Sequence, residues 1–134
     1  MVILPSDHHL AALKAISPRD LKGEIFVIVS GTAPVLRAVI DNYLKRTGIN
    51  IKPAHEADNV TMGLSLIVST GGVGLLPAYA QKFLPASVTS RPLKGYTPTV
   101  DLVLGYRKSN DSPILRVLLS RLDELVARVS KKAQ

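Results

Sequence analysis

The chain has 134 residues, a formal net charge of +7 at pH 7, and neither cysteine nor tryptophan. This length suits one ordinary domain with its own core, and the missing cysteines exclude disulfides, thiolate zinc sites and cysteine nucleophiles. Because no apolar run is long enough to cross a bilayer and no signal peptide is visible, we expect a soluble, cytoplasmic protein.

The basic balance raises nucleic acid as a partner. The lysines and arginines, however, stand in ones and twos along the chain, mostly at the ends of expected elements. The chain has few aromatic residues on which the bases of single-stranded nucleic acid could stack. A solvated basic surface is therefore favoured over direct contact of this chain with DNA.

The chain opens on a short apolar stretch, residues 2–4, that predicts a strand ending at Pro5. His8 and His9 follow. Neighbours in sequence do not share a helix face and no carboxylate cluster accompanies them, so no metal site is expected. Ser17 caps a brief helix that Gly23 ends.

A β-branched run over 25–29 predicts a buried strand that leads into Ser30, Gly31 and Thr32 at the start of a helix. Unpaired N–H groups at a helix start attract anions, and two hydroxyls stand beside them. Plain N-capping by Thr32, with Gly31 as a turn residue, explains the same residues without a ligand. The residues alone leave both interpretations open.

The next helix spans about 33–47 and carries one apolar stripe that includes Tyr43, whereas Arg37 lies mostly away from it. A strand over 49–56 follows this helix. Asp58 or Asn59 then caps a helix over 60–70 that is apolar nearly all round, so we expect it to be buried. His55-Glu56 matches the start of a zinc-protease motif, but that motif needs a second histidine where Asn59 stands, so zinc hydrolysis is excluded.

Residues 71–77 connect that helix directly to a buried strand. Gly71 and Gly72 end the helix, and Gly74 lets a neighbouring backbone approach. The order helix, glycine, strand is the reverse of a Walker loop or a dinucleotide fingerprint. No phosphate cradle and no cofactor are therefore expected.

The remaining pattern predicts a short helix over 78–84, an edge strand over 88–91, a strand over 100–106 and a long amphipathic helix from Pro113 to about Ser130. Strands and helices alternate through 25–77, which predicts an α/β fold: a doubly wound, mostly parallel sheet with helices on both faces. Ligands of such sheets lie beyond the carboxyl ends of the strands, here at 30–32, at 56–59 and from Pro77 onward.

Four segments together resemble the C-terminal part of LysR-type transcriptional regulators. They are Ile3-Leu4-Pro5-x-Asp7-His8-x-Leu10-Ala11, Asp20-Leu21, Phe26 to Ser30, and Gly71-Gly72-Val73-Gly74-Leu75-Leu76-Pro77. The likeness covers nearly the whole chain, and the last segment is its most specific part. His9 departs from the pattern, because many family members have proline there.

The resemblance implies a two-lobed effector domain of the periplasmic-binding-protein type II kind, of which this chain is the second lobe. Residues 1–16 would be a hinge strand and crossover from a first lobe, 17–99 the second lobe, and 100–134 a return hinge strand with a terminal helix of the first lobe. The chain is then a truncated regulator without its DNA-binding domain. The terminal helix is expected to cover the hinge strands or pack against another molecule.

The resemblance also implies a function: binding of a small, anionic effector between the lobes, without catalysis, in a homo-oligomer that contacts DNA only through the missing domain. A fragment of a periplasmic-type solute-binding protein is the alternative, and an enzyme is disfavoured because nucleophile elbow, metal cluster and cofactor fingerprint are missing. The effector-binding residues implied are Ser30, Gly31, Thr32, Phe26, Ile28, Asp58 and Asn59.

Overall fold

The structure is a computed structural model that describes residues 1–101 and 103–132. The chain forms two compact units that divide after Asp101. Among the described residues, no helix is both long enough and apolar enough to cross a membrane.

The first unit is built on a five-stranded sheet with the strand order β3-β2-β4-β1-β5. The strand β2 runs parallel to β3 and β4, whereas β1 runs antiparallel to both of its neighbours, β4 and β5. The prediction of a mostly parallel α/β sheet is confirmed, with β1 as the strand of opposite direction. The bounds are β1 (Val2–Pro5), β2 (Phe26–Val29), β3 (His55–Ala57), β4 (Val73–Leu75) and β5 (Val88–Arg91).

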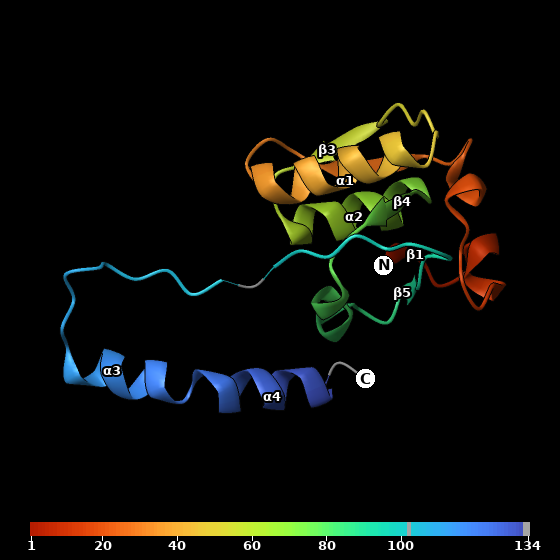
Figure 1. The fold of residues 1–134 in the computed structure, drawn as a ribbon. Coiled ribbons are helices and arrows are strands. Elements are labelled where there is room, and N and C mark those ends of the chain that lie inside the picture. The colour runs from red at the N-terminus through yellow and green to blue at the C-terminus, as the bar shows by residue number, and fades with distance from the viewer. Residues whose placement is uncertain (102, 133–134) are drawn as a thin grey trace. The chain divides into compact units, whose positions relative to one another are not determined.

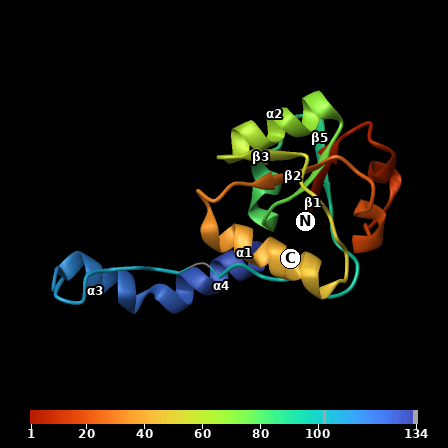
Figure 2. The ribbon, with the colours of Figure 1, turned by 90° about the horizontal axis from the view of Figure 1, so that it is seen from above.

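Helices cover both faces of this sheet, as predicted (Figure 1). One face packs against α1 (Pro34–Arg46) and the 3-10 turns η1 (His9–Ala12) and η2 (Pro18–Leu21), and the other against α2 (Val60–Thr70) and η3 (Ala78–Phe83). Figure 2 shows α1 and α2 on opposite sides of the strands. The alternation along a strand produces this division, because Val2 and Leu4 face one core and Ile3 faces the other.

The glycine-rich turn between α2 and β4 has the predicted form. Gly71 adopts the left-handed conformation with φ at 67°, and its N–H donates to the Ile67 carbonyl oxygen. In β4, a side chain at Gly74 would place its Cβ 3.0 Å from the Val27 carbonyl oxygen and 3.2 Å from Ile67 Cδ1. The glycine therefore permits the close approach of β2 and α2 to β4.

Two elements of this unit differ from their predictions. The strand expected over 49–56 is confined to His55–Ala57. The helix α2 is not buried all round, because Met62 and Val68 are 42% and 44% exposed and only Ile67 is fully buried. The sheet covers one face of the helix, so apolar residues on its other face remain in solvent.

The strand predicted over 100–106 is wrong for the described part of that range. Residues 100–101 and 103–106 form no regular secondary structure, and Leu102 lies outside the described residues. The sheet offers a reason. Both edges of β1 are already taken, one by β4 and the other by β5, so β1 has no free edge for a further strand. The predicted division of the chain into hinge and lobe segments at 16/17 and 99/100 stays a prediction.

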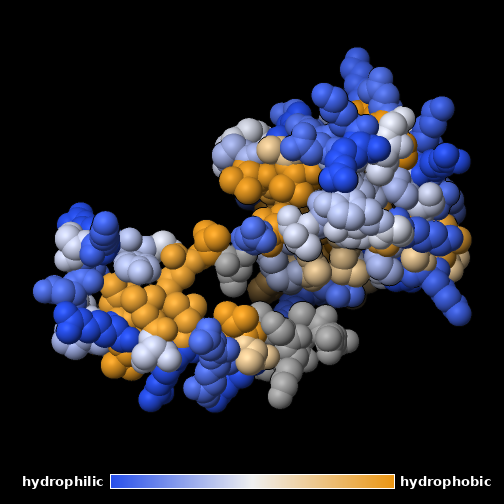
Figure 3. Space-filling view, viewed as in Figure 1, coloured by the Kyte–Doolittle hydropathy of each residue, from blue (hydrophilic) through white to orange (hydrophobic). Residues whose placement is uncertain are grey.

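The second unit contains α3 (Pro113–Ser120) and α4 (Leu122–Lys132), separated by a turn at Arg121. The single long helix predicted here is wrong. Apolar side chains gather on these helices (Figure 3), and their packing against hinge strands or another molecule stays a prediction. Up to residue 128, where burial is described, the large exposed apolar residues of α3 and α4 are Ile114, Val117, Leu118, Leu125 and Val126.

Candidate functional site

The candidate site lies at one edge of the sheet, where β2, β3 and β4 end and the antiparallel β1 begins. The register aligns Val29 with Ala57 and Leu75 with Val2, and Val2 also with Arg91 at the end of β5. Polar loops that follow these strands therefore meet along this edge. We call it the carboxyl edge, and it is where parallel α/β sheets hold ligands.

The turn after β2 is ordered by its own hydroxyls. Ser30 Oγ accepts from the Thr32 N–H at 3.2 Å and lies 2.9 Å from Thr32 Oγ1. Thr32 Oγ1 donates to the Asp58 carbonyl oxygen at 3.0 Å, so Ser30 is the donor in the hydroxyl pair. Ser30 is 8% exposed, while Gly31 and Thr32 are exposed.

The structure shows whether Thr32 caps the following helix. The N-cap of α1 is Ala33, which makes no side-chain cap, so plain N-capping by Thr32, one of the two interpretations left open, does not occur. Thr32 instead links the loop after β2 to the loop after β3. Gly31 lies at the exposed tip of this turn, next to the first turn of α1.

The second loop is formed by Asp58 and Asn59. Asn59 Oδ1 accepts from the Met62 N–H at 2.9 Å, so the predicted cap of α2 is confirmed and falls on Asn59. Asp58 contributes its carbonyl oxygen to Thr32 and exposes its side chain. The structure thus brings together five of the seven predicted site residues: Ser30, Gly31, Thr32, Asp58 and Asn59.

Phe26 and Ile28 do not belong to this group. Their exposed fractions are 0% and 2%, and both lie in the core between the sheet and α1. A side chain in β2 that faces this core has no solvent-facing surface to offer a ligand. The predicted contact of Phe26 and Ile28 with an effector therefore has no surface to occur on.

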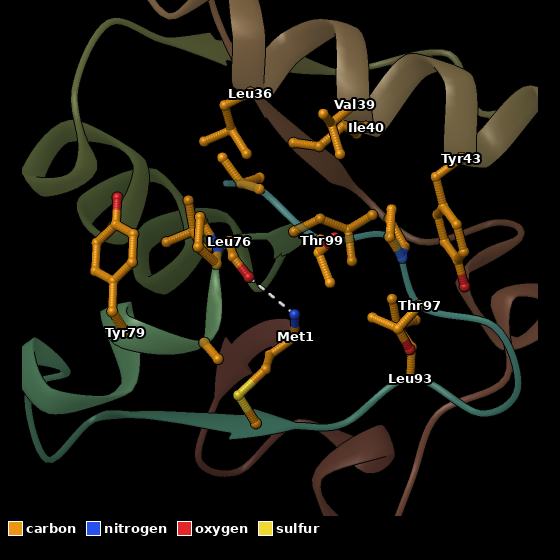
Figure 4. Close-up of a pocket in the computed structure, with 15 residues that line it drawn as sticks. Met1, Leu36, Val39, Ile40, Tyr43, Leu76, Tyr79, Leu93, Thr97 and Thr99 are labelled. Carbon is orange, nitrogen blue, oxygen red and sulfur yellow. Dashed lines mark hydrogen bonds between the residues drawn. The ribbon is translucent and has the colours of Figure 1, made fainter. Parts of the chain in front are cut away.

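An apolar pocket of about 400 Å³ opens along the carboxyl edge within the first unit. We call it the edge pocket (Figure 4). Tyr43 and Tyr79 lie at its opposite ends, and the Met1 amino nitrogen donates to the Leu76 carbonyl oxygen at 2.8 Å. It is lined by Met1, Leu36, Val39, Ile40, Tyr43, Leu75, Leu76, Pro77, Ala78, Tyr79, Leu93, Thr97, Pro98, Thr99 and Val100.

The polar groups of the edge pocket are few. Tyr43 is 2% exposed, and its buried hydroxyl has no hydrogen-bond partner among the described residues. Burial raises the pKa of this hydroxyl, so it stays protonated and able to donate. Thr97 and Thr99 add two hydroxyls, and no acidic or basic side chain lines the wall.

Sequence reasoning missed this pocket. It placed Tyr43 in the apolar stripe of its helix as a core residue, and the segment 97–99 carried no signal. The position of Tyr43 in the stripe was correct. No pattern in the sequence, however, shows that residues 97–100 leave an open pocket next to α1.

Arg37 was assigned to the solvent face of α1, yet it braces the carboxyl edge. Its Nη1 donates to the Val29 carbonyl oxygen at 3.0 Å and to Glu56 Oε1 at 3.1 Å, and its Nε donates to Asp41 Oδ2 at 3.0 Å. The hydrogen bond to Glu56, with that to Asp41, holds the pKa of the guanidinium above its usual value. Arg37 thus fixes the end of β2 relative to β3.

The fold is that of an α/β lobe of the periplasmic-binding-protein type II class. The family described as the LysR substrate binding domain matches residues 1–127, and the chain belongs to that family. The family predicted from the sequence motifs is thereby confirmed.

Two curated relatives are transcriptional regulators by name. The chain is 30% identical over 135 residues to the Hca operon transcriptional activator HcaR of Escherichia coli, covering 97% of this chain and 44% of the relative. It is 26% identical over 117 residues to the HTH-type transcriptional regulator AlsR of Bacillus subtilis, covering 87% and 39%. The chain therefore spans less than half the length of these relatives.

Solved structures show the same fold. The BenM effector binding domain with its effector benzoate has a TM-score of 0.64 at 23% identity, covering 71% of this chain and 44% of that one. The effector binding domain of QuiR in complex with shikimate has a TM-score of 0.59 at 18% identity, covering 72% and 46%. HinK, a LysR family transcriptional regulator from Pseudomonas aeruginosa, has a TM-score of 0.63 at 19% identity, covering 73% and 34%.

Proposed function

We propose that this chain is the effector-binding region of a LysR-type transcriptional regulator and that it senses a small anionic metabolite at the carboxyl edge. The observation that carries the proposal is the edge pocket, which opens along the same edge as the turn of Ser30 to Thr32. Its volume of about 400 Å³ suits a small molecule.

The two parts of the edge supply different chemistry. The edge pocket has apolar walls and exposed hydroxyls at Thr97 and Thr99, which suits a flat or aliphatic body bearing an oxygen. Because no basic side chain lines it, the charge of an anion needs another partner. The N–H of the exposed Gly31 and the N–H groups of Val35 and Leu36, which follow Pro34 in the first turn of α1, are such a partner, since the start of a helix carries the positive end of its dipole.

The effector acts by changing populations. In this proposal it binds one arrangement of the two lobes more tightly and so shifts the regulator toward that arrangement. Residues 1–16 and 100–134 connect the lobe to a first lobe, DNA is contacted by another domain of the regulator, and the regulator is a cytoplasmic homo-oligomer. No step in this function breaks or forms a covalent bond.

Thermal denaturation with small carboxylates tests the proposal. Benzoate and shikimate are the first probes, with benzamide as a neutral analogue of benzoate. Ligand that binds only the folded state stabilises it by about 2.7 kcal/mol when present at 100 times its dissociation constant. We expect a carboxylate to raise the melting temperature and benzamide to do so less.

Variants locate the binding. Thr32→Val disturbs the turn and Thr99→Val removes an exposed hydroxyl from the pocket wall, and each is expected to reduce the shift. Thr61→Val, on the exposed face of α2, is the matched control and keeps it. A shift that survives both Thr32→Val and Thr99→Val would place binding away from the carboxyl edge and contradict the proposal.

A further inference from the structure

His8, His9 and Glu24 form a cluster that the sequence did not reveal. His8 Nε2 lies 3.3 Å from Glu24 Oε2, and His9 Nε2 lies 3.2 Å from Glu24 Oε1. The two imidazole rings stack with centroids 4.5 Å apart and planes inclined by 28°, so both rings approach one carboxylate. Three potential ligand atoms thus lie within 4.8 Å of one another.

The sequence argument against a metal site assumed that His8 and His9 lie on one regular helix. They do not, because His8 precedes η1 with an extended backbone and His9 is its first residue. The missing carboxylate is also supplied from a distance, by Glu24 in the connection between η2 and β2. The expectation of no metal site therefore rested on two premises that the structure does not meet.

The spacing of these atoms suits tetrahedral coordination. With metal–ligand distances of about 2.0–2.2 Å for zinc, neighbouring ligands of a tetrahedron are about 3.3 Å apart. Each histidine nitrogen lies close to this distance from one oxygen of the Glu24 carboxylate, His8 from Oε2 and His9 from Oε1, and the ligand atoms of all three residues lie within 4.8 Å of one another. Both separations are longer than the 2.7–2.9 Å that is usual for a charge-assisted N–H···O bond. The histidines and Glu24 are therefore farther apart than in a tight ion pair.

The charge of the cluster also calls for a cation. The Glu24 side chain is only 19% exposed, and in the described ranges 1–101 and 103–132 its ion-pair partners are the two histidines, with no lysine or arginine. A partly buried carboxylate is stabilised by a positive charge beside it. With neutral imidazoles, a divalent ion supplies that charge directly.

We propose that His8, His9 and Glu24 bind a divalent transition-metal ion of the zinc class. The ligands are Nε2 of each histidine and the Glu24 carboxylate, whose Oε2 faces His8 and whose Oε1 faces His9, with water completing the coordination. Two histidines and one glutamate are a donor set that zinc accepts, and imidazole nitrogen selects such ions over magnesium and calcium.

One local hydrogen bond opposes this arrangement. His8 Nδ1 accepts from the Leu10 N–H at 3.2 Å, which places the proton of neutral His8 on Nε2. When Nε2 binds the ion, that proton moves to Nδ1 and the bond to Leu10 is lost. The bond is long, so its loss lowers the affinity without closing the site.

The ion would act far from the effector. β1 begins at the carboxyl edge and ends at Pro5, just before His8, and Glu24 lies just before the start of β2. The cluster is therefore at the opposite edge of the sheet, where the ion would join the connection after β1 to the connection before β2. This role is independent of the proposed effector site.

Titration of the untagged, EDTA-treated chain with zinc sulfate tests the proposal by calorimetry. We expect one ion per chain. His9→Ala and Glu24→Gln should each weaken binding at least about tenfold, because each removes one of three ligands. His9 is the better variant, because its side chain is 68% exposed and its removal should leave the fold intact.

His55→Ala is the matched control, since the exposed His55 in β3 is the remaining histidine and belongs to no cluster among the described residues. This variant should bind zinc as the parent does. Cobalt(II) gives a second readout, because tetrahedral coordination produces an intense visible absorption that His9→Ala should abolish. Lack of one-to-one binding, or equal binding by the parent and His9→Ala, would overturn the proposal.

Discussion

Thr32 Oγ1 donates a hydrogen bond to the backbone carbonyl oxygen of Asp58, 3.0 Å away. This bond joins the loops that follow two neighbouring parallel strands, β2 and β3. Ser30 completes the arrangement by donating to Thr32 and accepting from its N–H. The turn is therefore held in one conformation before any ligand arrives, which lowers the entropic cost of binding.

Thr32→Val is expected to lower the free energy of unfolding by about 1 kcal/mol, the net value of a hydrogen bond between neutral groups. Valine keeps the branched shape but cannot donate to the Asp58 carbonyl oxygen. Urea unfolding followed by circular dichroism measures the change. Thr61→Val, at an exposed position of α2, should leave the midpoint unchanged. Equal stability of Thr32→Val and the parent would show that the link between the loops contributes nothing.

Tyr43 makes stability depend on pH in the alkaline range. Burial raises the pKa of its hydroxyl in the folded state, so the folded chain holds this proton more tightly than the unfolded chain does. The associated stability is fully present below the unfolded value of about 10 and is lost as pH rises through the folded pKa.

Tyr43→Phe should therefore be as stable as the parent near neutral pH, since the hydroxyl has no hydrogen-bond partner to lose. Above about pH 10 the parent should lose stability faster than this variant. Urea midpoints across the alkaline range measure the difference. Tyr79→Phe, at an exposed tyrosine, is the control and should follow the parent. Parallel curves for the parent and Tyr43→Phe would contradict the effect.

Local signals in the sequence predicted much of the fold. Gly71 marks the end of α2 because only a residue without Cβ enters the left-handed region at no cost, and Pro92 limits β5 to an edge. The continuous apolar run at the center of β2 identifies a strand with helices on both sides. These features depend on a few neighbouring residues, so one sequence suffices to read them.

The rest depends on contacts between distant segments. Arg37 reaches Glu56 across 19 residues, and His8 and His9 meet Glu24 through the η1 and η2 connections. Residues 100–106 alternate like a strand, but a strand also needs a free edge, and β1 has none. Within the candidate site, hydroxyls next to a strand end were readable, whereas the wall of the edge pocket was not.

Gly74→Ala should destabilise the fold by about 1–3 kcal/mol, the range for forcing extra atoms into a packed core. The new Cβ would lie 3.0 Å from the Val27 carbonyl oxygen and 3.2 Å from Ile67 Cδ1, so β2 or α2 has to shift. Thermal or urea unfolding measures the loss. Gly105→Ala is the control, because a Cβ there meets nothing within 4 Å. Similar stability of the two variants would show that the approach at Gly74 is looser than described.

Arg91 secures the segment around η1 to the edge strand β5. Its guanidinium donates to the carbonyl oxygens of Ala11 at 2.6 Å and Leu13 at 2.9 Å, and to Thr89 Oγ1 and the Ser90 carbonyl oxygen. In the described part of the chain it pairs with no carboxylate, so neutral carbonyl and hydroxyl groups stabilise its charge. The planar fork of arginine is what reaches all of these acceptors.

Arg91→Met should therefore lower the free energy of unfolding by about 2–3 kcal/mol, because it leaves the carbonyl group of the buried Ala11 without its donor. Arg91→Lys keeps the charge but cannot form the fork, so it should recover only part of the loss. Arg19→Met, at an exposed position, controls for the removal of a positive charge. Urea unfolding should rank the parent and Arg19→Met above Arg91→Lys, and Arg91→Lys above Arg91→Met. If Arg91→Lys matched the parent, charge rather than the fork would hold η1 to β5.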